Sequence, residues 1–118
     1  MKAIQIQAPG ADYRLVVETV PQPEPGPGQV SIAVAAAGLN NADLLQARGK
    51  YPPPPGASTI LGMEVSGTVS ELGAGVSQWK PGDKVCALLA GGGYAEETVA
   101  DAAGTAMNQQ ALAGLEAA

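Results

Sequence analysis

The stretch GLNNADLLQARGKYPPPPGASTILGMEVSG, residues 38–67, decides the fold, because most of the special backbone positions of the chain fall within it. Near its start, Asn40 or Asn41 is suited to cap a helix, and Gly49 is suited to the left-handed residue that ends one. The prolines that follow Tyr51 require extended backbone, since each disfavours the helical region for the residue before it. The stretch therefore predicts one helix of about two turns in a chain otherwise built from strands.

Strand patterns flank this stretch on both sides. Alternating or β-branched apolar residues between glycine and proline turns are typical of half-buried strands. Val30, Ile32 and Val34, for example, fall on one face of a strand by the two-residue period. The segments with such patterns are 2–7, 14–20, 29–37, 61–72, 84–89 and 94–100. Together they predict a mainly β fold, a small and partly open β-barrel with one or two short helices.

Three finer expectations follow from glycine, proline and alanine. Gly62 and Gly67 interrupt the segment 61–72, which predicts a bulge or a close backbone approach. The sequence KPGD at 80–83 predicts a turn. Residues 101–118 are rich in alanine, which predicts a weak helix or a frayed extension.

Composition excludes several classes of function. The chain has 118 residues, a net charge of -5 and only six basic residues, which are scattered, so nucleic acid is not expected as a partner. No apolar run has the length needed to cross a bilayer, so we expect no membrane partner and a cytoplasmic protein. Cys86 is the only cysteine and forms no internal disulfide.

Metal and nucleotide sites also lack their usual residues. There is no histidine, and a carboxylate pair such as Asp43 and Glu64 supplies too few ligands, so no metal is expected. Cys86 lies in the apolar run VCALL, where a thiol is expected to pack as a small hydrophobe. The glycine clusters near Gly73 and Gly91 match neither the dinucleotide fingerprint nor the phosphate-binding loop of nucleotide hydrolases. We expect no complete dinucleotide site in this chain alone.

Polar groups in the central stretch remain as candidates. Asn40 is either a simple helix cap or a site residue. Tyr51 either covers the end of the barrel or donates a proton to, or stacks on, a bound ring. Glu64 is either exposed on a strand or a buried, orienting carboxylate.

The motifs GLNNADLLQARGKYPPPPGAS, ILGMEVSGTVSELGAGV and WKPGDKVCALLAGGGYAE closely resemble the zinc-free NAD(P)H quinone oxidoreductases of the medium-chain dehydrogenase/reductase superfamily. The subgroup is zeta-crystallin-like, and the resemblance is strongest to the branch with the p53-induced quinone oxidoreductase. It covers Met1 to about Glu96. Zinc alcohol dehydrogenases of this superfamily carry a zinc-bound cysteine where this chain has Asn40, a hydroxyl where it has Ala42, and a second ligand where it has Met63. The resemblance therefore agrees with the absence of a metal site.

The resemblance implies that residues 1–100 form a GroES-like, substrate-side catalytic domain and that 101–118 connect it toward a Rossmann domain absent from this chain. The implied activity is hydride transfer from NADPH to a quinone or enone, with NADPH also needing the Rossmann domain. Asn40 and Tyr51 would be catalytic, by positioning and hydrogen bonding, and Asn40, Asp43 and Met63 would lie near the cofactor. The chain alone would be an incomplete enzyme, and a homodimer is possible. The alternative is a non-catalytic barrel that only packs or oligomerises.

Overall fold

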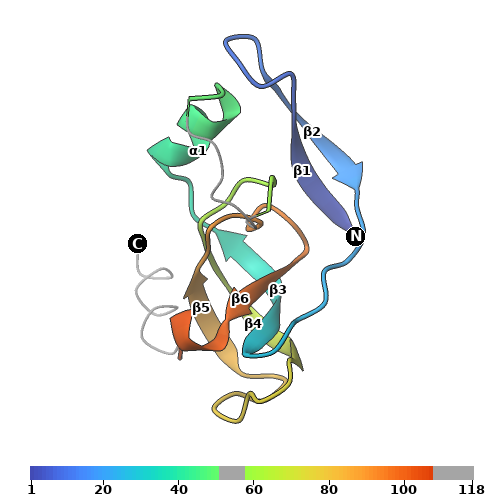
Figure 1. Ribbon diagram of the computed structural model, residues 1–118, viewed down its shortest axis with the longest axis vertical. Coiled ribbons are helices and arrows are strands. Elements are labelled where there is room, and N and C mark those ends of the chain that lie inside the picture. Colours follow the sequence, from blue (N-terminus) through green and yellow to red (C-terminus); the bar gives the residue numbers. More distant parts are fainter. Residues whose placement is uncertain (51–57, 108–118) are drawn as a thin grey trace.

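The computed structural model describes residues 1–50 and 58–107. Figure 1 shows a curled sheet in one half of the molecule and, in the other half, a hairpin (β1 and β2) and the helix α1. The elements are β1 (Lys2–Gln7), β2 (Arg14–Thr19), β3 (Gln29–Ala37), α1 (Asn41–Ala47), β4 (Glu64–Leu72), β5 (Lys84–Leu88), β6 (Glu97–Asp101), the 3-10 helix η1 (Ala102–Gly104) and β7 (Thr105–Met107).

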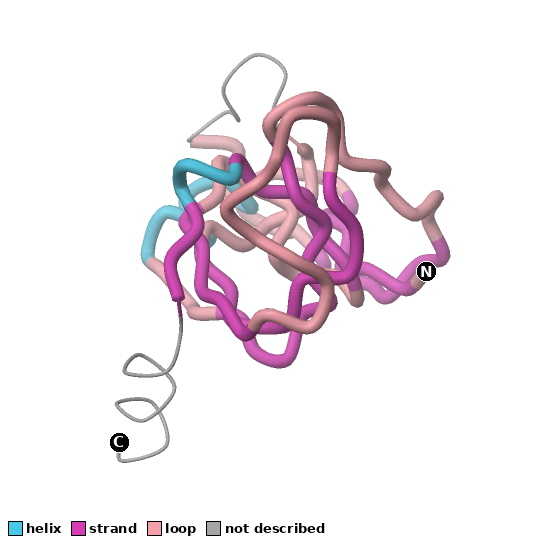
Figure 2. Tube along the Cα trace, turned by 90° about the horizontal axis from the view of Figure 1, so that it is seen from below, coloured by secondary structure: helices cyan, strands magenta, loops and turns pink. Residues whose placement is uncertain are grey.

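The larger sheet has the strand order β6-β3-β4-β5-β7, and β1 and β2 form a separate antiparallel pair. All neighbours in the larger sheet are antiparallel. Seen from below, its strands curl around a common interior (Figure 2). The prediction of a mainly β, partly open barrel with one or two short helices is confirmed.

The core lies inside the curl. Val30 and Ile32 are completely buried, and Val34 packs against them from the same face, as the two-residue period predicts. The buried set consists of Val30, Ile32, Val65, Val69, Val85, Ala87, Ala100 and Ala102. These are small or β-branched residues, which suit the concave face of a strongly twisted sheet.

Helix α1 is held at its end by the motif that the sequence suggests. Gly49 has a φ of 75°, and its N–H donates to the carbonyl of Gln46 at 3.0 Å. The N–H of Lys50 donates to the carbonyl of Leu45 at 2.8 Å. These two bonds form a Schellman motif, which satisfies carbonyls that a helix leaves free at its end. A third bond, from the N–H of Gly10 to the carbonyl of Ala47 at 3.0 Å, ties α1 to the hairpin side of the molecule.

The turn at 80–83 is confirmed by a bond from the N–H of Asp83 to the carbonyl of Lys80 at 3.1 Å. The close approach in β4 is confirmed at Gly67, where a Cβ atom would lie 2.1 Å from the carbonyl oxygen of Ala33. The pairing of β3 with β4 also carries two register shifts.

Two expectations need correction. Residues 101–107 do not begin a helical tail: β6 ends at Asp101, and after η1 the chain forms β7, which pairs with β5. Cys86 does not pack in the core. It is half-buried on the face of β5 opposite to Val85 and Ala87, since successive residues of a strand point to opposite faces. The division at residue 100 stays a prediction, and 108–118 lie outside the described residues.

Candidate functional site

Asp43 is the centre of a polar cluster at the start of α1. Its side chain is only 4% exposed. One carboxylate oxygen, Oδ2, accepts the backbone N–H of Asn40 at 3.0 Å, and Oδ1 accepts the backbone N–H of Gly62 at 3.3 Å. Asn40 is the N-cap of the helix and Asp43 is its third residue, so the first bond is half of a capping box. The second bond joins the helix to the segment that leads into β4.

Tyr94 completes this cluster. Its hydroxyl donates to Oδ2 of Asp43 at 2.6 Å and lies 3.3 Å from the carbonyl oxygen of Gly38. Burial raises the pKa of the Tyr94 phenol well above its ordinary value, and the hydrogen bond to Asp43 and the negative charges of Asp43 and Glu64 raise it further. The phenol is therefore protonated throughout the neutral range, as its role as donor requires.

Sequence reasoning missed Tyr94. The available signal was a lone aromatic residue directly after three glycines, in AGGGYAE, at the entrance to a strand. Glycines allow two backbones to approach closely: a Cβ atom at Gly62 would lie 2.7 Å from Gly93. The close approach of Gly62 and Gly93 places Tyr94, the next residue, beside the segment that contains Gly62.

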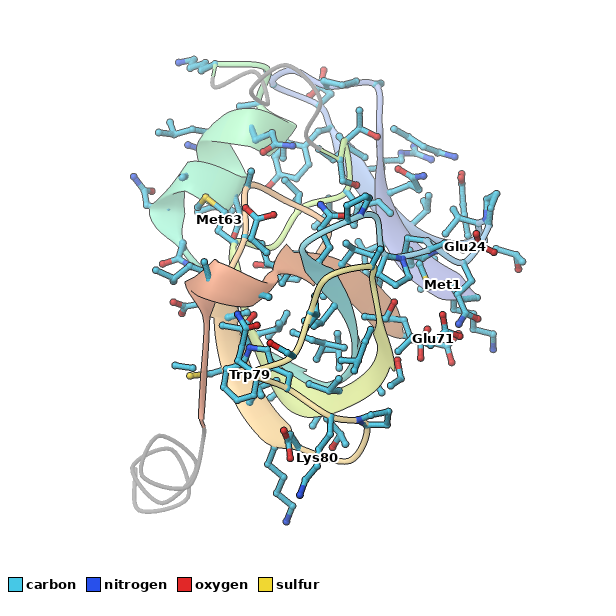
Figure 3. All side chains as sticks on the ribbon, turned by 60° about the horizontal axis from the view of Figure 1, so that its bottom comes forward. Met1, Glu24, Met63, Glu71, Trp79 and Lys80 are labelled. Atoms are coloured by element: carbon cyan, nitrogen blue, oxygen red, sulfur yellow. The ribbon has the colours of Figure 1, made fainter. Side chains whose placement is uncertain are left out.

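The structure brings three of the four predicted site residues into one region. Asn40 is half-buried, Asp43 is buried, and Met63 is half-buried and follows Gly62. Figure 3 shows Met63 at the end of the molecule that carries α1, away from Trp79 and Lys80. Tyr51 lies outside the described residues. Glu64 is exposed on β4, so of the two alternatives for this carboxylate the strand-exposed one holds and the buried, orienting one does not.

An apolar pocket begins beside this cluster. Its volume is about 500 Å³, and Gly38 and Glu64 belong to both its wall and the surroundings of Tyr94. The remaining wall consists of Ala36, Ala37, Val65, Ser66, Cys86, Ala87, Leu88, Gly104 and Ala106. Leu88 is 75% exposed, and Leu39, which follows Gly38, is 85% exposed. Apolar side chains left this open are typical of a surface that binds something apolar.

The described ranges 1–50 and 58–107 contain no group of three or more His, Cys, Asp or Glu residues placed to hold a metal ion. Within the same ranges, no helix is long and apolar enough to span a membrane. The described residues of this region offer hydrogen bonding and apolar contact. An amide side chain at Asn40 can both donate and accept, which suits a carboxamide or a carbonyl oxygen.

The curled sheet with the helix α1 is the fold of a GroES-like β-domain. The chain belongs to the alcohol dehydrogenase GroES-like domain family, whose profile matches residues 26–110. It is therefore part of the medium-chain dehydrogenase/reductase superfamily.

Several of the similar proteins are named as oxidoreductases. The acryloyl-coenzyme A reductase of Sulfurisphaera tokodaii is 45% identical over 89 residues, which are 75% of this chain and 26% of that protein. The structure of the Escherichia coli quinone oxidoreductase complexed with NADPH is 28% identical, with a TM-score of 0.79 over 91% of this chain and 33% of the other. The CurK enoyl reductase is also 28% identical, with a TM-score of 0.80 over 93% and 36%. The chain thus spans about a quarter to a third of these relatives.

Proposed function

We propose that this chain is the substrate-side domain of a zinc-free, NADPH-dependent oxidoreductase that reduces quinones or related enones by hydride transfer. In this proposal a Rossmann domain elsewhere in the protein holds most of the nucleotide, and the isolated chain is inactive. Asn40 and Tyr51 are the catalytic residues, and Asn40, Asp43 and Met63 serve the cofactor.

The observation that carries the proposal is the position of Asn40. It caps α1 two residues after Gly38, which belongs to the wall of the apolar pocket, and Asp43 fixes its backbone. A nicotinamide or quinone ring needs an apolar wall and a few fixed polar groups, and both are present here. The residues fit that end of a dinucleotide. They do not fit its phosphates, because the one α-helix of the described residues has seven residues and no glycine-rich loop before it.

Bound NADPH would supply the hydride. The residues of this chain orient the nicotinamide and the substrate and exclude water from them. The Asn40 amide hydrogen-bonds a carboxamide or the substrate oxygen, and Met63 supplies apolar contact where zinc-dependent relatives carry a ligand. Tyr51 flanks the substrate ring. Asp43 is buried and serves the cofactor through Asn40, whose backbone it holds while it also accepts hydrogen bonds from Gly62 and Tyr94.

Proton delivery follows from the same geometry. Tyr94 is a poor proton donor to substrate, because its O–H already donates to Asp43 and its pKa is raised. Solvent water supplies the proton to the reduced quinone. The hydride transfer itself needs little help from a Lewis acid, because a quinone is already a good electron acceptor.

The test uses the full-length protein that contains this chain. NADPH oxidation is followed with 1,4-benzoquinone and with an α,β-unsaturated ketone for the wild type, Asn40→Ala and Tyr51→Phe. We expect Asn40→Ala to lower kcat/KM by about 10- to 100-fold through lost positioning. Asn41→Ala is the matched control, since Asn41 is exposed one residue later. Full activity in both site variants would refute the two assignments, and stoichiometric zinc in the purified protein would refute the zinc-free mechanism.

The second candidate is a non-catalytic barrel that packs or oligomerises, and the exposed Leu39 and Leu88 beside the apolar pocket favour it. Sedimentation and NADPH titration of the 118-residue chain separate the two. The enzyme proposal expects weak NADPH binding by this chain alone, and tight one-to-one binding would contradict it. A stable oligomer of a full-length protein without reductase activity would support the non-catalytic reading.

A further inference from the structure

Three segments far apart in the sequence meet at one carboxylate. Asn40 follows β3, Gly62 leads into β4, and Tyr94 precedes β6. Each donates a hydrogen bond to Asp43, and the shortest, at 2.6 Å, comes from the Tyr94 hydroxyl. No other side chain of the described residues is hydrogen-bonded to all three segments.

Tyr94 is itself fixed at both ends of its backbone unit. Its N–H donates to the carbonyl of Leu61 at 2.9 Å, and its carbonyl accepts the N–H of Ile4 at 2.8 Å. The phenol therefore projects from a backbone unit, just before β6, that two hydrogen bonds hold in place. Helix α1, by contrast, has seven residues, too few for a helix to be stable by itself, so its place depends on such tertiary bonds.

We propose that Tyr94 is a positioning residue that acts through Asp43 to set the place of Asn40 and of the Gly62–Met63 backbone at the proposed active site. The inference rests on the proposed function for what these groups do to substrate. The coupling itself does not depend on it. Without the Tyr94 hydroxyl, the buried carboxylate loses its shortest hydrogen bond and turns toward other donors or water, and the two backbone N–H groups it holds lose their fixed partner.

The experiment compares Tyr94→Phe, Asp43→Asn and the double variant in the full-length protein. Tyr13→Phe is the matched control: Tyr13 is a half-buried tyrosine in the loop between β1 and β2, and its hydroxyl is not among the three donors to Asp43. Two readouts are taken, the steady-state kinetics with 1,4-benzoquinone and NADPH, and the hydrogen exchange rates of the Asn40 and Gly62 amides. Both are measured at least 15 °C below the melting temperature of each variant, where essentially all of the protein is folded.

We expect Tyr94→Phe to lower kcat about tenfold with KM changed less than threefold, since small displacements of positioning groups affect turnover strongly. The Asn40 and Gly62 amides should exchange about tenfold faster, while amides of β4 are unchanged. The double variant should be no worse than Asp43→Asn, because both changes break one bond. If Asp43→Asn does not fold, Tyr94→Phe decides alone, since it removes a single oxygen.

The outcomes separate this inference from the proposed function. A wild type without reductase activity refutes the proposed function, and the exchange rates then still decide whether Tyr94 holds the two backbone groups. If the Asn40 and Gly62 amides exchange faster in Tyr94→Phe but kcat of an active enzyme is unchanged, Tyr94 only stabilises the local structure, and the positioning role is overturned. Unchanged exchange at both amides overturns the coupling.

Discussion

Gly67 in β4 is the residue at which a single added methyl group should damage the fold most directly. A Cβ atom there would lie 2.1 Å from the carbonyl oxygen of Ala33 and 2.9 Å from Cγ2 of Ile32. Neither atom can swing aside, because one belongs to the backbone of β3 and the other to a completely buried side chain. Gly67 has no positive φ, so alanine would fit its backbone conformation and only space opposes it.

The magnitude follows from how far β3 must move. A normal carbon–oxygen contact requires a shift of roughly 1 Å, which stretches an N–H···O bond from about 2.9 Å to about 3.9 Å and abolishes it. Losing one or two such bonds costs about 1 kcal/mol each, and repacking Ile32 costs a further 1 to 3 kcal/mol or so. We expect Gly67→Ala to lower the free energy of unfolding by about 3 kcal/mol, which corresponds to roughly 10–15 °C in Tm.

Gly49→Ala is the matched comparison, because it tests backbone strain without a steric clash, whereas Gly67→Ala tests a steric clash without backbone strain. Gly49 has a φ of 75°, but among the described residues a Cβ atom there would meet nothing closer than 3.9 Å. The left-handed conformation costs alanine about 1–2 kcal/mol, and the stiffer unfolded chain returns about 0.4–1 kcal/mol. The expected net loss is about 1 kcal/mol.

Urea unfolding of the 118-residue chain, followed by circular dichroism, gives both values. The free energy of unfolding should decrease in the order wild type, Gly49→Ala, Gly67→Ala. A Gly67→Ala variant within about 0.5 kcal/mol of the wild type would refute the reasoning, since ordinary surface substitutions cost no more than that. If Gly49→Ala proved less stable than Gly67→Ala, the paired strands β3 and β4 would accommodate an added methyl group at a lower cost than the end of α1 does.

Ser31→Ala should leave the stability unchanged or raise it by up to about 1 kcal/mol in urea unfolding, because the Ser31 hydroxyl is buried at 1% exposure without a hydrogen-bond partner among the described residues. The pKa of Tyr94 is raised above its unfolded value of 10.0, so its contribution is fully present below pH 10 and is lost as the pH rises further. Urea unfolding between pH 9 and pH 11 should therefore show a steeper loss in the wild type than in Tyr94→Phe; equal slopes would contradict the shift. Ile32→Val should cost about 1 kcal/mol at a fully buried position, whereas Val17→Ala, at 64% exposure, should cost less than about 0.5 kcal/mol; similar melting curves for the two would contradict the assigned core.

Local structure was predictable where neighbouring residues in the sequence are also the physical cause. The strand 29–37 follows from the two-residue period, and the end of α1 follows from Gly49, whose backbone freedom the Schellman motif needs. Where the pattern is uniform, prediction failed. The run VCALL is apolar at every position, so nothing in it says that Cys86 faces outward, and the apparent helical tail from Asp101 gives way to a strand because β5 offers a free edge.

By itself, the sequence determined the chain order of the strands β1 to β6, the turns between them and the one α-helix with a cap at Asn40 or Asn41, because these depend on residues a few positions apart. It also carried the resemblance to the medium-chain dehydrogenase/reductase superfamily, whose GroES-like domain profile matches residues 26–110. Only the tertiary structure decided that Tyr94 meets Asp43 across 51 positions, that Gly62 joins them, and that an apolar pocket opens beside Gly38. Such contacts depend on how a curled sheet brings distant strand ends together, and no local pattern encodes that distance.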